Sequence, residues 1–219
     1  PSDISHGAKS TIAKLNIHSH KNGLSGKKMG RIYRDVEFYL PETCPGVFVE
    51  IGSDRGEGST GFLYHVAGQK HTRLISVDID PRARLRNDPV GPEYVTADAG
   101  MWSQQFDQPI SLLYLDNFDY IWDIASVSPA QQAQMAQYAA RGQTMTNQNC
   151  QMAHMQQLLN LYDSLLPDCV VVMDDTYCVN DCWIGKCGPG VVFLKAQGWH
   201  VRHESLDCGV ILSRSLTKL

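Results

Sequence analysis

The residues best suited to chemistry in this sequence are acids that stand at the ends of short apolar runs. In chain order these acids are Glu50, Asp78, Asp98, Asp116, Asp174 and Asp175. A carboxylate in such a place can cap the following helix, accept hydroxyl or amino groups of a ligand, or hold a cation. One acid alone would be a helix cap more often than not, so the order and the neighbours of these acids decide their interpretation.

The first acid belongs to a glycine-rich turn, VFVEIGSDRGEGST, which covers Val47 to Thr60. Glycine lets the backbone adopt positive φ and approach a ligand closely, and a helix that follows presents its N–H groups to a polar group. The spacing is that of a GxGxG preceded by an acid, not the GxGxxG of dinucleotide-binding folds. The residues expected to line a ligand are Glu50, Gly52, Ser53, Asp54, Gly56 and Ser59.

Two further acids are placed to complete a nucleoside site. The run LISVDID carries Asp78 roughly 28 residues after Glu50, where an acid can accept both hydroxyls of a ribose. The run YVTADAGMW brings Asp98 to the end of the next strand, where it can meet the amino group of an adenine. These positions predict that the glycine-rich turn and the two acids bind one nucleoside-containing ligand.

Two acidic clusters follow the next two apolar runs of the predicted sheet. Asp116 stands near Asp119 in LYLDNFDY, and Asp174 adjoins Asp175 in VVVMDDTY. Converging carboxylates repel one another unless a cation or shared protons intervene, and oxygen ligands suit Mg²⁺, with Ca²⁺ or Mn²⁺ as less favoured ions. The alternative is that Asp174 and Asp175 cap a turn and bind nothing.

The elements that must position these acids alternate between strand and helix. Strands are expected at Gly46–Ile51, Arg73–Val77, Tyr94–Thr96, Ile110–Leu115, Cys169–Met173, His200–Glu204 and Gly209–Leu212. Helices are expected at Lys27–Leu40, Ser59–Ala67, Ala130–Ala140, Gln151–Leu165 and Gly190–Gln197. Several strands are apolar on both faces, as in a parallel sheet covered by helices on each side. The pattern predicts an α/β, doubly wound, Rossmann-like sheet that ends in an antiparallel hairpin.

The predicted domain organisation has three parts. Residues 1–26 are polar and weakly patterned, which predicts a loose leader, and residues 27–219 form a single domain. Within that domain, about residues 121–157 are crowded with Gln, Ala and Met and are long for a link between adjacent strands. Such an insertion is often a lid or a substrate-binding element, although an ordinary covering helix is the alternative. His154, inside it, is a candidate general base, unless it is simply a solvated helix residue.

Composition excludes several classes of protein. The 43% apolar and 19% charged content is that of a globular protein, and the net charge of -4 gives no basic excess for nucleic acid. The chain has no run of about 18 apolar residues and no signal-peptide pattern, so we expect a cytoplasmic protein without a membrane segment. Cys178, Cys182 and Cys187 have neither zinc nor iron–sulfur spacing and are interpreted as reduced thiols. The sequence does not determine whether the protein forms a homo-oligomer.

The order of an acid-glycine loop, a ribose acid, an adenine acid and a fourth-strand carboxylate resembles that of the class I S-adenosylmethionine (SAM) methyltransferases. The resemblance covers about Val47 to Ser213 and implies a sheet of order 3-2-1-4-5-7-6 with the last strand antiparallel. It also implies SAM as cofactor, with the methionine end near Glu50 and Gly52 and with Asp116 beside it. The ribose would then lie at Asp78 and the adenine at Asp98. Asp54 departs from the glycine that is commonest at its position.

The far acids resemble those of the metal-dependent O-methyltransferases of the catechol, antibiotic-sugar and cephalosporin-tailoring types. Matched residue by residue, Asp116, Asp174 and Asp175 would be the Mg²⁺ ligands. The resemblance implies that the cation activates a hydroxyl of a small-molecule acceptor, which then takes the methyl group from SAM. Those families often have Lys or His where this chain has Asp119, which is left open as a base, an extra ligand or a structural residue.

Two other functions remain open at this point. One is a metal-independent methyltransferase that acts on nitrogen or on a protein side chain, and the other is a SAM-binding module without turnover. Aromatic residues after the strand ends could form a wall for a ring or sugar acceptor, or could be routine packing. They are Trp102, Tyr120, Trp122, Tyr177 and Trp183.

Overall fold

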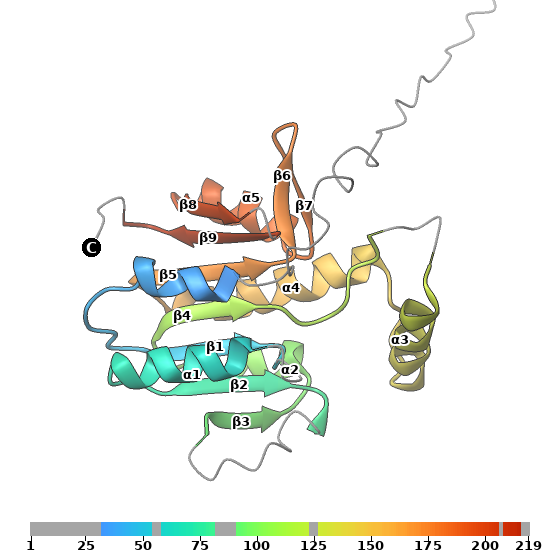
Figure 1. Ribbon diagram of the computed structural model, residues 1–219, viewed down its shortest axis with the longest axis horizontal. Helices are drawn as coiled ribbons and strands as arrows, with labels where there is room; N and C mark the ends of the chain where they lie inside the picture. The colour runs from blue at the N-terminus through green and yellow to red at the C-terminus, as the bar shows by residue number, and fades with distance from the viewer. Residues whose placement is uncertain (1–31, 54–57, 82–90, 123–126, 206–207, 216–219) are drawn as a thin grey trace, which may run out of the picture.

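A computed structural model describes residues 32–53, 58–81, 91–122, 127–205 and 208–215. The expected leader and residues 54–57 of the glycine-rich turn lie outside these ranges, and these include Asp54 and Gly56, two of the residues expected to line a ligand. The described chain builds a central seven-stranded sheet with helices on both faces (Figure 1). Within the described ranges, no helix is both long and apolar enough to span a membrane.

The sheet has the predicted order. Its strands are β1 (Val47–Ile51), β2 (Leu74–Asp78), β3 (Glu93–Thr96), β4 (Ile110–Leu115), β5 (Leu165–Asp174), β8 (His200–Ser205) and β9 (Gly209–Ser213). They are arranged as β3-β2-β1-β4-β5-β9-β8, with β1 to β5 parallel and β9 antiparallel between β5 and β8. Every residue of β1 and β4 is buried, as expected of apolar strands covered on both sides.

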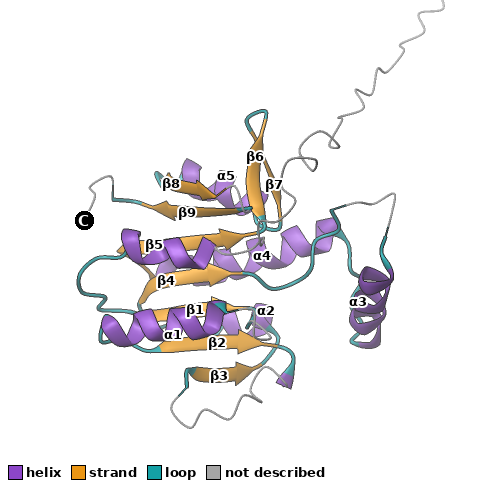
Figure 2. Ribbon diagram, viewed as in Figure 1, coloured by secondary structure: helices purple, strands orange, loops and turns teal. Residues whose placement is uncertain are grey.

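Helices cover the sheet in two layers (Figure 2). The helices of the described chain are the 3-10 helix η3 (Ile32–Tyr39), α1 (Ser59–Gln69), α2 (Ala99–Ser103), α3 (Pro129–Ala140), α4 (Asn147–Leu161), the 3-10 turn η5 (Tyr162–Ser164) and α5 (Gly188–Ala196). The helices η3 and α1 pack on one face, and α2, α4 and α5 pack on the other. In contrast, α3 has no buried residue and stands beside the sheet rather than on it (Figure 1).

The structure differs from the expected elements at four main places. The helix expected at Lys27–Leu40 is described only from Ile32 onward, as the 3-10 helix η3, and the short α2 was not predicted. The helix expected to reach Leu165 ends at Leu161, because Pro167 favours extended backbone before it and β5 begins at Leu165. A hairpin of β6 (Thr176–Val179) and β7 (Cys182–Gly185) was not predicted. Its turn is made by Asn180 and Asp181, both at positive φ, as the twist of a tight hairpin requires.

Two of the three clustered cysteines lie in this hairpin, and the third follows it. Cys178 and Cys182 lie on its two strands, whereas Cys187 is buried at the start of α5. All are free thiols.

Candidate functional site

Glu50, the first acid, is fully buried at the end of β1. Its carboxylate accepts hydrogen bonds from the hydroxyls of Ser59 (3.0 Å) and Thr60 (2.8 Å), and also from Ser76. These bonds join the first turn of α1 and the strand β2 to β1. Glu50 and Ser59 therefore fix the two ends of the glycine-rich turn, whose middle residues lie outside the described ranges.

Gly52 explains how the turn leaves β1. It has a φ of +93°, and a Cβ at this position would lie 2.6 Å from the amide nitrogen of Asn117 and from the carbonyl oxygen of Asp116. Backbone bonds on both sides hold this close approach, from Gly52 N–H to Val77 O (2.8 Å) and from Asp116 N–H to Ile51 O (2.9 Å). Only glycine lets the turn pass the end of β4 this closely.

The predicted ribose acid is oriented by backbone amides. The Asp78 carboxylate accepts from Ser53 N–H at 3.0 Å with one oxygen and from Asp80 N–H at 2.7 Å with the other. Ser53 also exchanges a hydroxyl hydrogen bond of 2.7 Å with Ser76. Asp78 is thus linked to the start of the glycine-rich turn.

The predicted adenine acid is a helix cap. The Asp98 carboxylate accepts a hydrogen bond from Met101 N–H at 3.0 Å and is the N-cap of α2. The same residue also lines a pocket, together with Asp78.

This pocket lies over the carboxyl ends of β2, β3 and β4, the edge at which open α/β sheets bind ligands. Its lining from α3, α4 and the link between them includes Gln134, Gln137, Tyr138, Arg141, Gln143, Ala153, Gln156 and Gln157. The predicted insertion therefore forms the wall opposite the acids. Within the described chain, the buried side-chain oxygens of Asn117 and Gln157 have no hydrogen-bond partner, and both residues line the pocket.

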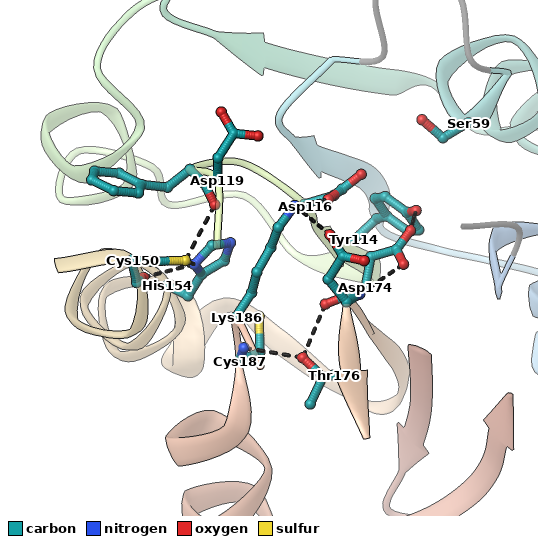
Figure 3. A network of polar contacts seen from close by, with 12 residues as sticks. Ser59, Tyr114, Asp116, Asp119, Cys150, His154, Asp174, Thr176, Lys186 and Cys187 are labelled. Atoms are coloured by element: carbon teal, nitrogen blue, oxygen red, sulfur yellow. Dashed lines mark hydrogen bonds and ion pairs between the residues drawn. The ribbon is translucent and has the colours of Figure 1, made fainter. Parts of the chain in front are cut away.

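Asp119 belongs to this pocket wall. Its backbone N–H donates to the Tyr138 hydroxyl (2.9 Å), which in turn lies 3.4 Å from the Asp119 carboxylate. Phe118 packs on Tyr138 with ring centroids 4.5 Å apart, and Arg141 approaches the buried Asp80 at 4.0 Å. These contacts attach α3 to the sheet edge. Figure 3 shows the Asp119 carboxylate directed away from Asp116.

A lysine occupies the centre of the predicted metal site (Figure 3). The buried Lys186 places its Nζ 2.6 Å from Asp116 Oδ1 and 2.9 Å from Asp175 Oδ2. Its own backbone N–H donates to the Asp175 carbonyl at 3.0 Å, so the turn between β7 and α5 is attached to the end of β5. Lys186 was not among the residues predicted for the site, and its only signal in the sequence is a lone lysine within the apolar, glycine-rich segment WIGKCGPG.

Asp174 turns to a different partner. It is buried, and its two oxygens accept from the Tyr114 hydroxyl and from Asp175 N–H (2.8 Å). Asp175 itself has a φ of +48°, which points the two adjacent carboxylates to separate partners. The structure thus unites Asp116 and Asp175 around Lys186 and leaves Asp174 facing Tyr114.

The charges in this cluster oppose one another. Burial disfavours the ammonium, but Asp116 and Asp175 together raise the pKa of Lys186 well above its ordinary value. Burial raises the pKa of Asp174 to about 6, and the charge of Asp175 adds to this shift. Burial likewise raises the pKa of Asp116, whereas Lys186 acts against that change. One cation therefore compensates a group of three acids.

The residues as arranged do not fit a divalent metal. The ammonium takes the position between Asp116 and Asp175 that the ion would need, and both oxygens of Asp174 already have donors. In the described ranges, no group of three His, Cys, Asp or Glu residues is arranged to hold a metal.

His154 is buried on α4 rather than solvated, with 2% of its surface exposed. Its Nδ1 bonds to the Cys150 carbonyl at 2.8 Å, which makes Nδ1 the donor and leaves Nε2 as an acceptor. Burial lowers the pKa of His154 to about 4, so the ring is neutral at pH 7. Nε2 makes no well-formed hydrogen bond within the described chain, although the backbone of Asn117 lies near enough to act on the pKa of the ring.

Three of the five predicted rim aromatics gather into a row. Trp122 packs between Tyr120 (centroids 4.7 Å apart) and Tyr177 (5.6 Å), which links the segment after β4 to β6. The other two pack elsewhere, since Trp102 lies against Phe106 and Trp183 lies beneath Lys195.

No family model matches the chain, and no curated protein matches it by sequence. Several solved structures are similar. An rRNA methylase from Streptococcus thermophilus is 12% identical, with 85% of this chain and 98% of that chain covered and a TM-score of 0.43. The complex of LepI with SAM is 14% identical, with 79% and 43% covered and a TM-score of 0.46. CalS11, a TDP-rhamnose 3'-O-methyltransferase of calicheamicin biosynthesis, is 14% identical, with 77% and 71% covered and a TM-score of 0.41.

The fold of this chain is defined by its own sheet topology. The sheet order 3-2-1-4-5-9-8, with antiparallel final strands and helices on both faces, agrees with the expectation from the sequence. The chain has an α/β, Rossmann-like fold with a seven-stranded mixed sheet, as the sequence predicted.

Proposed function

We propose that the chain transfers a methyl group from SAM to a hydroxyl of a small-molecule acceptor. The observation that carries the proposal is the pocket that joins Asp78 and Asp98 at the sheet edge, beside the turn at Gly52. Asp78 accepts the ribose hydroxyls, and Asp98 lies on the adenine side. The buried oxygen of Gln157 offers a second acceptor for an amino group on that side.

The methionine end of the cofactor is assigned to the glycine-rich turn. Gly52 and Ser53 begin it and Ser59 ends it, with Glu50 holding both sides together. The roles of Asp54 and Gly56 rest on the sequence alone. When bound, SAM supplies a methyl group on a positively charged sulfur; all other groups that the reaction needs come from the acceptor and this chain.

The acceptor is assigned to the side of β4 and β5. The row of Tyr120, Trp122 and Tyr177 suits an aromatic or sugar ring. His154 is neutral at pH 7 and offers Nε2 to the acceptor hydroxyl, whose proton it takes as the oxygen–methyl bond forms. Asp119 supports the pocket wall through Tyr138 in this proposal.

The side chain that lies between Asp116 and Asp175 favours methyl transfer without a metal over the metal-assisted reaction. An Mg²⁺, Ca²⁺ or Mn²⁺ ion was expected from the acids, but Lys186 favours methyl transfer without a metal. A metal-independent enzyme can also act on nitrogen or on a protein side chain. Assays with and without a chelator, over hydroxyl, amine, nucleic-acid and protein acceptors, separate these candidates.

The first test is binding of SAM and of its demethylated product by calorimetry. The Asp78→Asn variant should lower the affinity roughly 10- to 100-fold, because a charge-assisted bond to a hydroxyl contributes about 1.5–3 kcal/mol. Asp107→Asn, which changes an exposed acid outside the pocket, should leave the affinity unaltered. Absence of binding by the wild type at millimolar ligand contradicts the proposal, and binding without transfer to any acceptor favours the non-catalytic module.

A further inference from the structure

Lys186 has an unusual environment for a lysine. The side chain is 8% exposed, and its ammonium touches two carboxylates that come from different strand ends, Asp116 after β4 and Asp175 after β5. These two bonds use two of the three ammonium protons. Within the described chain, no third acceptor is bonded to the ammonium.

The main chain holds this arrangement in place. Gly185, just before the lysine, has a φ of +97°, and a Cβ there would lie 2.0 Å from the Asp175 carbonyl oxygen. Lys186 N–H then bonds to that same carbonyl (3.0 Å), and Cys187 N–H bonds to the Thr176 hydroxyl (3.0 Å). The β6–β7 hairpin therefore returns the lysine to the acids by backbone contacts that do not depend on its charge.

We propose that the Lys186 ammonium is the permanent cation of this reaction centre and occupies the position that a divalent metal would need between Asp116 and Asp175. Only one part of the inference rests on the proposed function, namely that the third ammonium proton of Lys186 faces the acceptor oxygen during methyl transfer. The other part, that a side chain fills the metal position, does not depend on catalysis.

Electrostatics explains why the two cations exclude each other. An ammonium and a divalent ion within a few ångströms repel strongly in a partly buried site, and the same two carboxylates cannot serve both at short range. An ammonium also keeps three directed protons, so it can donate to an oxygen that gains negative charge without the desolvation that Mg²⁺ requires.

The experiment measures Mn²⁺ binding by electron paramagnetic resonance on chelator-treated full-length protein. The wild type should leave the signal of free Mn²⁺ unaltered up to millimolar metal. Lys186→Ala removes the ammonium and leaves both acids, so it should bind Mn²⁺ at least about tenfold more tightly than the wild type. Adding Asp175→Asn to that variant should abolish the gain.

Lys195→Ala is the matched control, because Lys195 is exposed on α5 and its ammonium lies over the Trp183 ring, away from both acids. It should bind no Mn²⁺. A folded Lys186→Ala variant that gains no binding overturns the proposal. So does saturable Mn²⁺ binding by the wild type that Asp175→Asn removes, a measurement that decides the question even if Lys186→Ala does not fold. Calorimetry with SAM is a separate readout, so failure of the proposed function is distinguishable from failure of this inference.

Discussion

Asp78 and Asp98 are each held by backbone amides before any ligand arrives. A carboxylate that accepts an N–H bond in its own protein is fixed in direction, so binding a ligand orders fewer side-chain torsions. A carboxylate has about four lone-pair sites, so an acid that accepts a bond from a backbone amide can also accept one from a hydroxyl or an amine. At the scale of single residues, helix capping and ligand binding are therefore compatible roles of the same acid.

His154 predicts a specific dependence of stability on pH. In the folded chain its pKa is lowered to about 4, whereas in the unfolded chain it returns to about 6.5. The unfolded state then binds the proton more readily between these values, so the free energy of unfolding falls as the pH falls through this window. For this group the loss between about pH 7 and pH 5 is roughly 2 kcal/mol.

Comparison with a His154→Leu variant isolates this contribution in urea unfolding. The wild-type curve alone mixes two effects, because Asp174 has a raised pKa of about 6 and its contribution falls as the pH rises. As the pH falls, the free energy of unfolding of the wild type should decrease relative to that of the variant. Parallel curves at both pH values would show that His154 is not buried in its neutral form.

At the scale of elements, the join of β1 to α1 requires Gly52. Gly52→Ala combines a φ of +93° with a Cβ 2.6 Å from the backbone that directly follows β4, and we expect a loss of about 1–3 kcal/mol in the free energy of unfolding. Gly68→Ala is the matched control, because it lies in α1 with nothing within 4 Å of its Cβ. It should stabilise the protein by about 0.5–1 kcal/mol. Equal effects from the two changes would contradict the close approach at β4.

The helix α3 is the element that ligand binding should change most. It lines the pocket, buries no residue of its own, and is attached mainly through Tyr138 and Arg141. Elements with few buried contacts open at low free energy, so their amides exchange quickly. Added SAM should therefore slow amide hydrogen exchange over residues 129–140 and leave α5 unaltered.

The Tyr138→Ala variant tests the route of that protection. Without the ring on Phe118 and the bond to Asp119, exchange in α3 should stay fast in the presence of SAM. Slowing in the variant equal to that in the wild type would mean that α3 closes on the ligand by other contacts.

Strands were the elements that the sequence predicted best. The apolar runs of the central strands β1, β4 and β9 are buried on both faces, and Ile110–Leu115 has the same bounds in the structure as in the expectation. The β6–β7 hairpin was missed because its four-residue strands mix polar and apolar residues without a clear period. Its one local signal was the Asn180–Asp181 pair at the turn.

The acids could be placed at one edge from sequence because a parallel sheet brings its strand ends together. The partner of Asp116 could not be found in this way, since Lys186 is 70 residues away and reaches it only through the return of the unpredicted hairpin. Asp174 and Asp175 likewise share one strand end but have different partners, because Asp175 has positive φ. Local pattern determines which edge a residue lies on, whereas tertiary contacts determine what it touches.

Across the whole molecule, the two halves of the site meet between β1 and β4. The sheet order changes direction there, with β2 and β3 on one side and β5 and β9 on the other. Asp78 and Asp98 lie on the first side, Lys186 and Asp175 on the second, and Gly52 touches the backbone of Asp116 at the boundary. Such a reversal leaves a crevice at the carboxyl ends of the strands, which suits a ligand that spans both halves.

This division predicts which parts of the cofactor stabilise the folded chain. A ligand at 100 times its dissociation constant adds about 2.7 kcal/mol to the free energy of unfolding, or roughly 5–10 °C in Tm for a protein of this size. S-adenosylhomocysteine should give a shift of this order. Adenosine, which meets only the side of Asp78 and Asp98, should give a smaller shift at equal concentration, and methionine alone should give none.

The shifts in Tm that ATP and NAD cause test which kind of nucleotide the pocket binds. The charged residues that line the pocket are three acids, Asp78, Asp98 and Asp119, and one base, Arg141, which lies near Asp80. A chain of phosphates would therefore meet mainly negative charge. ATP and NAD should therefore shift Tm less than adenosine does. A larger shift with NAD than with S-adenosylhomocysteine would instead assign the glycine-rich turn to a pyrophosphate and remove the basis for methyl transfer.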